Sequence, residues 1–151
     1  MALRYSRNFR TSATASGAAA LEIIAGAGKS FRLMELGITI VNATASTFAL
    51  GRPAAKGITP TSPVALLSYQ NGDSAGVLAK GAVAWGTGPT IPAGYFRQVT
   101  LPATAGAEKI WEFSEAGMQK QGGILVPAGG SIILWTLSIV SIADVYVVIE
   151  E

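Results

Sequence analysis

The stretch FRLMELGITIV, residues 31–41, carries the clearest structural signal in the chain. From Met34 to Ile40 its apolar residues recur at every second position, whereas the positions between them are small or polar. A period of two places neighbouring side chains on opposite faces of a β-strand, whereas an amphipathic helix has a period near 3.6. The stretch therefore predicts a half-buried strand, with one face formed by Met34, Leu36, Ile38 and Ile40 and the other by Glu35, Gly37 and Thr39.

The same alternation returns near the end of the chain, in residues 132–139 and again in residues 143–149. Between residues 20 and 131, shorter alternating runs are separated by Gly- and Pro-rich turns, and only residues 114–121 suggest a helical turn. About eight to ten short strands with turns between them are typical of a sandwich or barrel. We expect helix to be a minor component and the core to include Met34, Leu36, Ile38, Trp135, Leu137, Val145 and Val147.

Composition limits the chemistry open to this chain. It contains no histidine and no cysteine, and 13% of its residues are charged, compared with about a quarter in ordinary globular proteins. These absences exclude a thiol nucleophile, a Ser-His pair, an imidazole or thiolate metal site and a disulfide. Half of the residues are hydrophobic, which predicts that subunits bury surface against one another. We expect a structural or binding protein that is not an enzyme, with no catalytic residue, metal or cofactor.

The N-terminus is the basic part of the chain. Its three arginines precede every acidic residue, and removing these three from the eleven Lys and Arg leaves eight, against nine Asp and Glu. A near-neutral body argues against a nucleic-acid partner. Residues 1–19 lack periodicity and predict an extended basic N-terminal arm, followed by a β-sandwich domain over residues 20–151. An arm of this kind can order along a neighbouring protein, and the candidate partner-binding residues are Arg4, Tyr5, Arg7, Phe9 and Arg10.

Residues 26–30, GAGKS, resemble the end of a phosphate-binding loop. The complete motif needs a glycine five residues before Gly28, where this chain has Ile23, and a helix after the loop. Here a strand pattern follows instead, so no helix N-terminus is available to hold phosphates. The segment therefore predicts a hairpin turn.

Carboxylates and aromatic residues are the other candidates for a site. Paired carboxylates can act on a sugar, but no base or nucleophile accompanies Glu108, Glu112 and Glu115, and solvated acids are the default. Aromatic residues in alternating strands are more often core than stacking platforms. The adjacent residues Tyr95 and Phe96 are the best candidates for contact with a partner, because we expect one of the two to face outward. The other aromatic candidates are Trp85, Trp111 and Trp135.

Residues 124–149 are apolar enough to be considered as a membrane span, with Asp144 as their only charge. Pro127, Gly129 and Gly130 interrupt the run near its start, and serines recur along it. The segment divides better into two strands, so we expect no membrane partner.

Four parts of the chain resemble small phage proteins of one kind: residues 21–53, the loop at 86–93, the turn at 126–131 and the closing strand at 143–148. Together with the length and the N-terminal segment, they are similar to capsid decoration, or cement, proteins with a jelly-roll fold, which sit on the shells of tailed phages. The resemblance covers most of residues 20–151, and it contributes no catalytic residues. Trimeric tumour-necrosis-factor-like and lectin domains share this architecture.

The resemblance implies an antiparallel jelly-roll β-sandwich that forms homotrimers and binds the major capsid protein of a phage. It also implies a structural virion protein that is made in the host cytoplasm, binds the outer capsid surface and stabilises the shell. The alternative is a trimeric carbohydrate- or receptor-binding head of a phage or another assembly.

Overall fold

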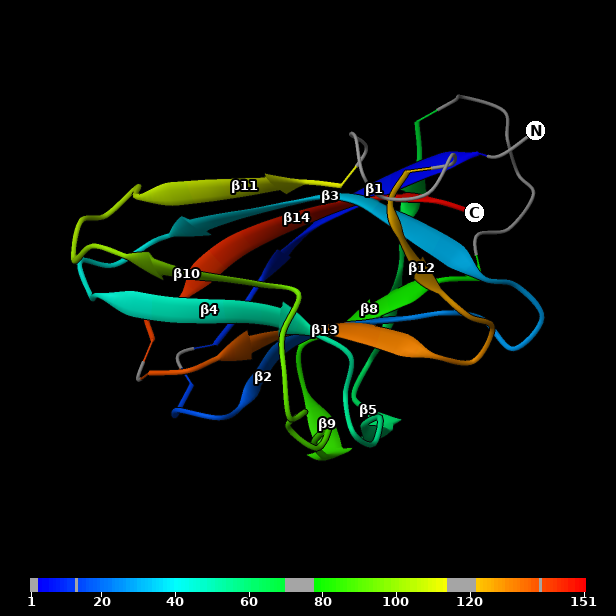
Figure 1. Cartoon of the computed structure of the whole chain (residues 1–151), viewed down its shortest axis with the longest axis horizontal. Helices are drawn as coiled ribbons and strands as arrows, with labels where there is room; N and C mark the ends of the chain where they lie inside the picture. The colour runs from blue at the N-terminus through cyan, green and yellow to red at the C-terminus, as the bar shows by residue number, and fades with distance from the viewer. Residues whose placement is uncertain (1–2, 13, 70–77, 114–121, 139) are drawn as a thin grey trace.

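The computed structural model describes residues 3–12, 14–69, 78–113, 122–138 and 140–151, and every regular element in these ranges is a β-strand (Figure 1). The helical turn expected at 114–121 lies outside them. The described part of the chain contains no helix of the length and apolar character needed to cross a membrane. The strands are β1 (Arg4–Arg10), β2 (Ala19–Ile24), β3 (Phe31–Ile40), β4 (Ser46–Gly51), β5 (Ile58–Pro60), β6 (Val64–Ala65), β7 (Leu67–Ser68), β8 (Lys80–Ala82), β9 (Trp85–Thr87), β10 (Arg97–Leu101), β11 (Glu108–Glu112), β12 (Ile124–Val126), β13 (Ser131–Thr136) and β14 (Ala143–Glu150).

The strands form two six-stranded antiparallel sheets packed face to face as a sandwich (Figure 1). The first sheet has the order β11-β3-β14-β1-β7, with β12 also paired to β3. The second sheet has the order β10-β4-β13-β2-β8-β6. Strands β5 and β9 form a separate two-stranded sheet. The prediction of an all-β sandwich is therefore confirmed.

The eight strands of five or more residues pair in a nested order. The first of them, β1, pairs with the last, β14; β2 pairs with β13, β3 with β11, and β4 with β10. The chain is thus folded as a double ribbon whose two ends meet, and the backbones of Leu3 and Glu151 exchange hydrogen bonds in both directions. Each half of the chain depends on the other for its pairing.

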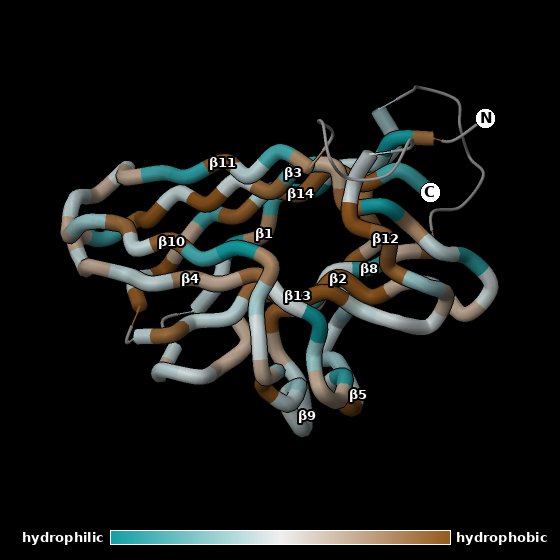
Figure 2. Tube along the Cα trace, in the orientation of Figure 1, coloured by the Kyte–Doolittle hydropathy of each residue, from teal (hydrophilic) through white to brown (hydrophobic). Residues whose placement is uncertain are grey.

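The main core lies between the two sheets and follows the predicted alternation. In β14, Ala143, Val145, Val147 and Ile149 are buried, and the residues between them are partly exposed. Hydrophobic and hydrophilic residues alternate in this way along the long strands (Figure 2). Alternate side chains of a strand point to opposite faces, so each sheet contributes one apolar face to the core.

Strand β3 departs from the expected pattern at one residue. Its register with β14 shifts by one position at Met34, which is the mark of a β-bulge. After the bulge, Leu36 and Ile38 face the core as predicted; before it, Phe31 and Leu33 take the inward positions. Met34 is buried but lies outside the main core cluster. Its predicted burial is confirmed and its predicted face is wrong, because an extra residue reverses the alternation.

Strand β13 is buried on both faces. Ile132 and Leu134 belong to the main core, whereas Ile133 and Trp135 belong to a second, smaller cluster on the outer face of the second sheet. The predicted burial of Trp135 is confirmed, but Leu137 is only partly buried. Loops therefore have to cover this outer face.

The N-terminal segment contradicts the prediction of an extended arm. Residues 4–10 form β1, which pairs along its whole length with β14. The following residues are also attached: the Thr11 amide donates to Ala143, and the Gly17 amide donates to Thr136. The accessible surface of the chain is 7560 Å², close to the ~7,200 Å² of a compact protein of this mass. The sequence predicted an arm because β1 is formed by pairing with a strand far away in the chain, which a local pattern does not reveal.

A short segment, residues 64–69, closes one side of the sandwich. Its β6 pairs with β8 of the second sheet, and its β7 pairs with β1 of the first. Leu66, between these two strands, is buried in the main core. The Arg7 side chain donates a hydrogen bond of 2.8 Å from Nη1 to the carbonyl of Ala65. Residues 64–69 thus join the two sheets at this edge.

Candidate functional site

Two of the five predicted partner-binding residues lie in the core of the subunit itself. Tyr5 and Phe9 are buried, and the Phe9 ring lies so close to Gly81 of the second sheet that a Cβ there would be 2.1 Å from Phe9 Cζ. They cannot serve as exposed apolar anchors, so this part of the prediction is wrong. The structure assigns them to packing between the sheets.

Two of the three arginines are paired with acids of β14 on the outer face of the first sheet. Arg10 donates two hydrogen bonds of 2.8 Å, from Nε and Nη2, to the carboxylate of Asp144. Arg4 donates from Nε to Glu150 at 3.3 Å. The bidentate contact with Arg10 lowers the pKa of Asp144, because it stabilises the ionised carboxylate. The role of Arg4, Arg7 and Arg10 in partner binding stays a prediction.

Tyr146 occupies the centre of the same outer face. Its hydroxyl donates a short hydrogen bond to Glu35, and its ring covers Gly37. Burial, assisted by the hydrogen bond to Glu35 and the charge of that carboxylate, raises the pKa of Tyr146 from 10.0 to about 12. The polar side chains of this outer face thus bond to one another, as in Arg10–Asp144, Arg4–Glu150 and Tyr146–Glu35.

The outer face of the second sheet carries a projecting structure of a different kind. Residues 52–63 and 84–95, which we call the loop lobe, extend beyond the sandwich and contain β5 and β9 (Figure 1). Backbone hydrogen bonds link Ala54 to Thr90, Thr90 to Ala55 and Thr61 to Ala84. No residue of the loop lobe is fully buried. It has no core of its own, so contacts with the sandwich must hold it.

A buried carboxylate provides one such contact. Glu22 of β2 has an exposed fraction of 0%. Its Oε2 accepts a 2.7 Å hydrogen bond from Trp85 Nε1 in the loop lobe, and its Oε1 accepts a 2.6 Å hydrogen bond from the Ser131 hydroxyl. A Cβ at Gly57 would lie 2.4 Å from the Trp85 ring, so only glycine fits beside it. We call Glu22, Ser131 and Trp85 the Glu22 latch.

The loop lobe also contains strained backbone. Thr59 and Ser62 have φ angles of 50° and 46°, and they are the only non-glycine residues in the described ranges with positive φ. This conformation costs about 1–2 kcal/mol for a residue with a Cβ. Opposite Thr59 lies Gly86, where a Cβ would be 2.5 Å from Thr59 Oγ1. The strain is thus built into the pairing of β5 with β9.

The surface of the loop lobe is apolar and cationic. Ile58 is 62% exposed and Ile91 is 43% exposed. Neither stretch of the loop lobe contains Asp or Glu, whereas both Arg52 and Lys56 belong to it. The chain's described acids lie elsewhere, on the first sheet, in the Glu22 latch and at Glu151.

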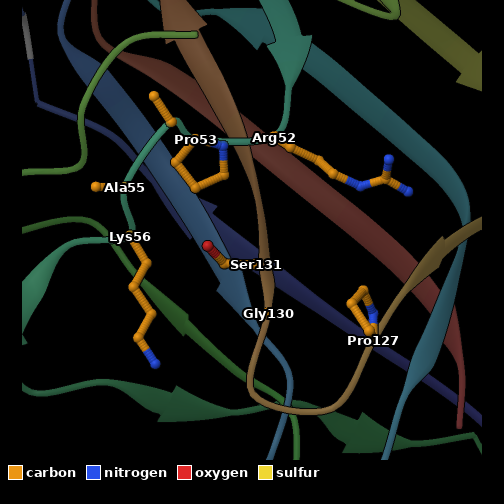
Figure 3. Close-up of a pocket in the computed structure, with 8 residues that line it drawn as sticks. Arg52, Pro53, Ala55, Lys56, Pro127, Gly130 and Ser131 are labelled. Atoms are coloured by element: carbon orange, nitrogen blue, oxygen red, sulfur yellow. The ribbon is translucent and has the colours of Figure 1, made fainter.

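A pocket of about 270 Å³ lies at the root of the loop lobe, where it meets the turn before β13 (Figure 3). Arg52 and Lys56 extend from its rim in different directions (Figure 3), and they donate to the carbonyls of Leu125 and Gly129 respectively. Arg52 also stacks on the exposed Phe96 ring, 5.2 Å from its centre. The pocket has no aromatic residue, and it is lined by Arg52, Pro53, Ala54, Ala55, Lys56, Pro127, Gly130 and Ser131.

The other candidate motifs of the sequence lie in a turn, in the core and on β11. Residues 26–30 form a turn that leads into β3, but β2 and β3 lie in different sheets, so the predicted hairpin is wrong and the turn connects the two sheets. Trp111 and Trp135 are buried, as predicted for core aromatics, and Phe96 is the more exposed of its pair with Tyr95. Glu108 and Glu112 are exposed on β11, and Glu115 lies outside the described residues. No group of three potential metal ligands occurs among the described residues.

The loop lobe and its latch were missed by sequence reasoning. One signal was present: Glu22 is the single charge in the apolar run from Ala18 to Gly28. A lone acid in such a run marks a buried carboxylate that needs partners. Its partners, Trp85 and Ser131, are distant in sequence, so they could not be identified from the pattern.

The fold and this site define an all-β protein, a sandwich of two antiparallel sheets that carries a projecting cationic lobe. No family model matches the chain, and no curated protein matches its sequence. Among solved structures, the chain shows a weak likeness to the decameric BFDV capsid protein, with 10% sequence identity and a TM-score of 0.21 over 99% of this chain and 96% of that one.

Proposed function

We propose that the chain is a jelly-roll decoration protein, which binds the outer surface of a phage capsid and stabilises the shell. The nested strand order carries this proposal. Pairing of first with last, second with second-last and so on inward is the order expected for a jelly roll, a double-sheet architecture used by viral capsid proteins, lectins and cupins. The cement proteins that the sequence resembles have the same jelly-roll architecture.

Two observations favour a decoration protein over the other users of this architecture. A metal-dependent cupin-like enzyme would need ligands such as histidine, which the chain lacks. A carbohydrate-binding head would present an aromatic platform beside polar groups, whereas the pocket has no aromatic residue and Arg52 stacks on Phe96. We therefore propose a binding role without catalysis.

A decoration protein can bind the shell tightly because many copies of it bind together. Each subunit needs only modest affinity, because subunits held together raise one another's effective concentration at the shell. We propose a homotrimer, as the resemblance implies. The low content of charged residues, 13%, supports an oligomer, since it leaves apolar surface to be covered.

The proposal is tested by adding the purified protein to capsid shells assembled without it. We expect saturable co-sedimentation and greater resistance of the decorated shells to heat. Failure of the intact protein to bind, together with binding to a glycan array, would instead support the carbohydrate-binding alternative.

A further inference from the structure

We propose that the loop lobe is the element that docks the sandwich onto its partner, with Ile58 entering an apolar hollow rimmed by carboxylates on the shell protein. The inference rests on the proposed function, since it names the surface that would perform it. The partner is a different protein, not a second copy of this chain.

The first argument is that several unfavourable features occur together in this one lobe. It holds Thr59 and Ser62, the two strained residues of the described ranges. It is held by a buried carboxylate, Glu22, whose donors among the described residues, Trp85 and Ser131, are both neutral. It also exposes Ile58. Local features that oppose stability are expected at functional sites, where a particular geometry matters more than stability.

The second argument is rigidity. The Glu22 latch fixes β9 to the second sheet, and pairing with β9 fixes β5 and hence Ile58. On the other side of the root, Arg52 donates to the Leu125 carbonyl in β12, and Lys56 donates to the Gly129 carbonyl in the turn between β12 and β13. A preorganised projection loses little conformational entropy on binding. The lobe is therefore suited to insertion into a fixed hollow.

The third argument concerns the chemistry of the partner. The loop lobe is acid-free and contains two cations. Arg52 and Lys56 each have further N–H donors beyond the one that each gives to a backbone carbonyl. Carboxylates around an apolar hollow would complement both properties.

A second copy of the chain offers a poorer fit. Its pocket at the root of the loop lobe is rimmed by the same two cations, which would repel an approaching lobe. Its exposed acids Glu108 and Glu112 lie on β11, beside the exposed Ile110, and an extended strand presents no hollow to Ile58.

The test compares Ile58→Asp with Ile110→Asp in co-sedimentation with shells assembled without the protein. Both substitutions place the same charge at an exposed isoleucine, 62% and 44% exposed respectively, but Ile110 lies on the first sheet. We expect the dissociation constant of Ile58→Asp to rise at least about tenfold and that of Ile110→Asp to change little. Ile58→Ala, which removes the apolar contact without adding a charge, should give a smaller rise. Melting temperatures confirm that all three variants are folded.

Equal binding by Ile58→Asp and the wild type would overturn this inference and leave the proposed function intact. Absence of wild-type binding would overturn the proposed function itself. If Ile58→Asp dissociates the purified protein into smaller species in sedimentation, then the lobe is an interface between copies, and the inference about its partner is wrong.

Discussion

At the scale of single residues, Glu22 is the most consequential side chain in the molecule. A carboxylate removed from water is strongly disfavoured unless donors satisfy it. Here the donors are neutral, Trp85 on one oxygen and Ser131 on the other. The Glu22 latch therefore joins three segments of the chain through one side chain. Its role is to position the loop lobe.

Replacement of Glu22 should distinguish hydrogen bonding from charge. In Glu22→Ala the Trp85 N–H and the Ser131 hydroxyl lose their acceptor, and we expect a loss of about 2–4 kcal/mol in the free energy of unfolding. Glu22→Gln should lose about 1 kcal/mol or less, because the amide oxygen can accept from Trp85 and the amide N–H can donate to the hydroxyl oxygen. Urea titration measures both. Equal losses in the two variants would show that the charge, not the hydrogen bonds, stabilises the lobe.

The raised pKa of Tyr146 predicts that the folded protein loses stability at high pH. Its pKa is about 12 in the folded protein against an ordinary 10.0, so the folded state holds the phenolic proton more tightly than the unfolded state. The resulting stabilisation is complete below pH 10.0 and is lost as the pH rises toward about 12. The melting temperature of the wild type should therefore fall more steeply over this range than that of Tyr146→Phe. Tyr95→Phe, in the loop lobe, is the matched control and should follow the wild type.

At the scale of elements, the strands differ in how far their sequences reveal them. The alternation of β14 correctly predicted its inward residues between Ala143 and Ile149. The strand lies inside the first sheet with a neighbour on each side, and one of its faces is buried along its whole length. In β3 the bulge at Met34 reversed the alternation, and no local feature of the sequence announces it. The chain's periodicity therefore predicted the class of fold and most of the core.

Strand β1 was missed because its pattern is broken by a charge. Arg7 occupies the position between Tyr5 and Phe9 on the inward side, where its guanidinium reaches the carbonyl of Ala65. The outward arginines find their acids on β14, more than 130 residues away. Contacts over such separations depend on the nested fold, and the same reason hides the loop lobe and its latch.

Deletion of residues 1–10 tests this account of β1. The deletion removes a strand paired along seven residues with β14 and removes the buried Tyr5 and Phe9. Loss of a buried aromatic side chain alone costs about 3–5 kcal/mol, against about 5–15 kcal/mol of total stability. We expect no cooperative thermal transition in circular dichroism. Arg10→Ala, which removes only an exposed pair with Asp144, should melt close to the wild type. If the truncated protein unfolds cooperatively near the wild-type temperature, then residues 1–10 are an arm that the fold does not need, and this account of β1 is wrong.

At the scale of the whole molecule, charge and shape are segregated. The first sheet presents arginines and acids that already satisfy one another, as in the pairs Arg10–Asp144 and Arg4–Glu150. The loop lobe, on the far side of the sandwich, presents isoleucine and two cations that form no salt bridge with a carboxylate of the described residues. A protein with two such different faces is suited to lie on a surface, with one face bound and the other in solvent.

The proposed homotrimer is tested by sedimentation velocity. Permanent interfaces commonly bury about 2,000 Å² or more in total, and such contacts persist on dilution. We expect one species of three times the chain mass of 15.5 kDa at micromolar concentration. A stable monomer under these conditions would contradict the trimer.

Quantitative mass spectrometry of purified particles from the source tests the decoration role most directly. The copy number of this chain is measured against that of the major capsid protein. A decoration protein should be present in a fixed ratio to the capsid subunit, on the order of hundreds of copies per particle, because it occupies a repeated lattice site. Absence from the particles, or a number of copies too small to cover the shell, would contradict the account.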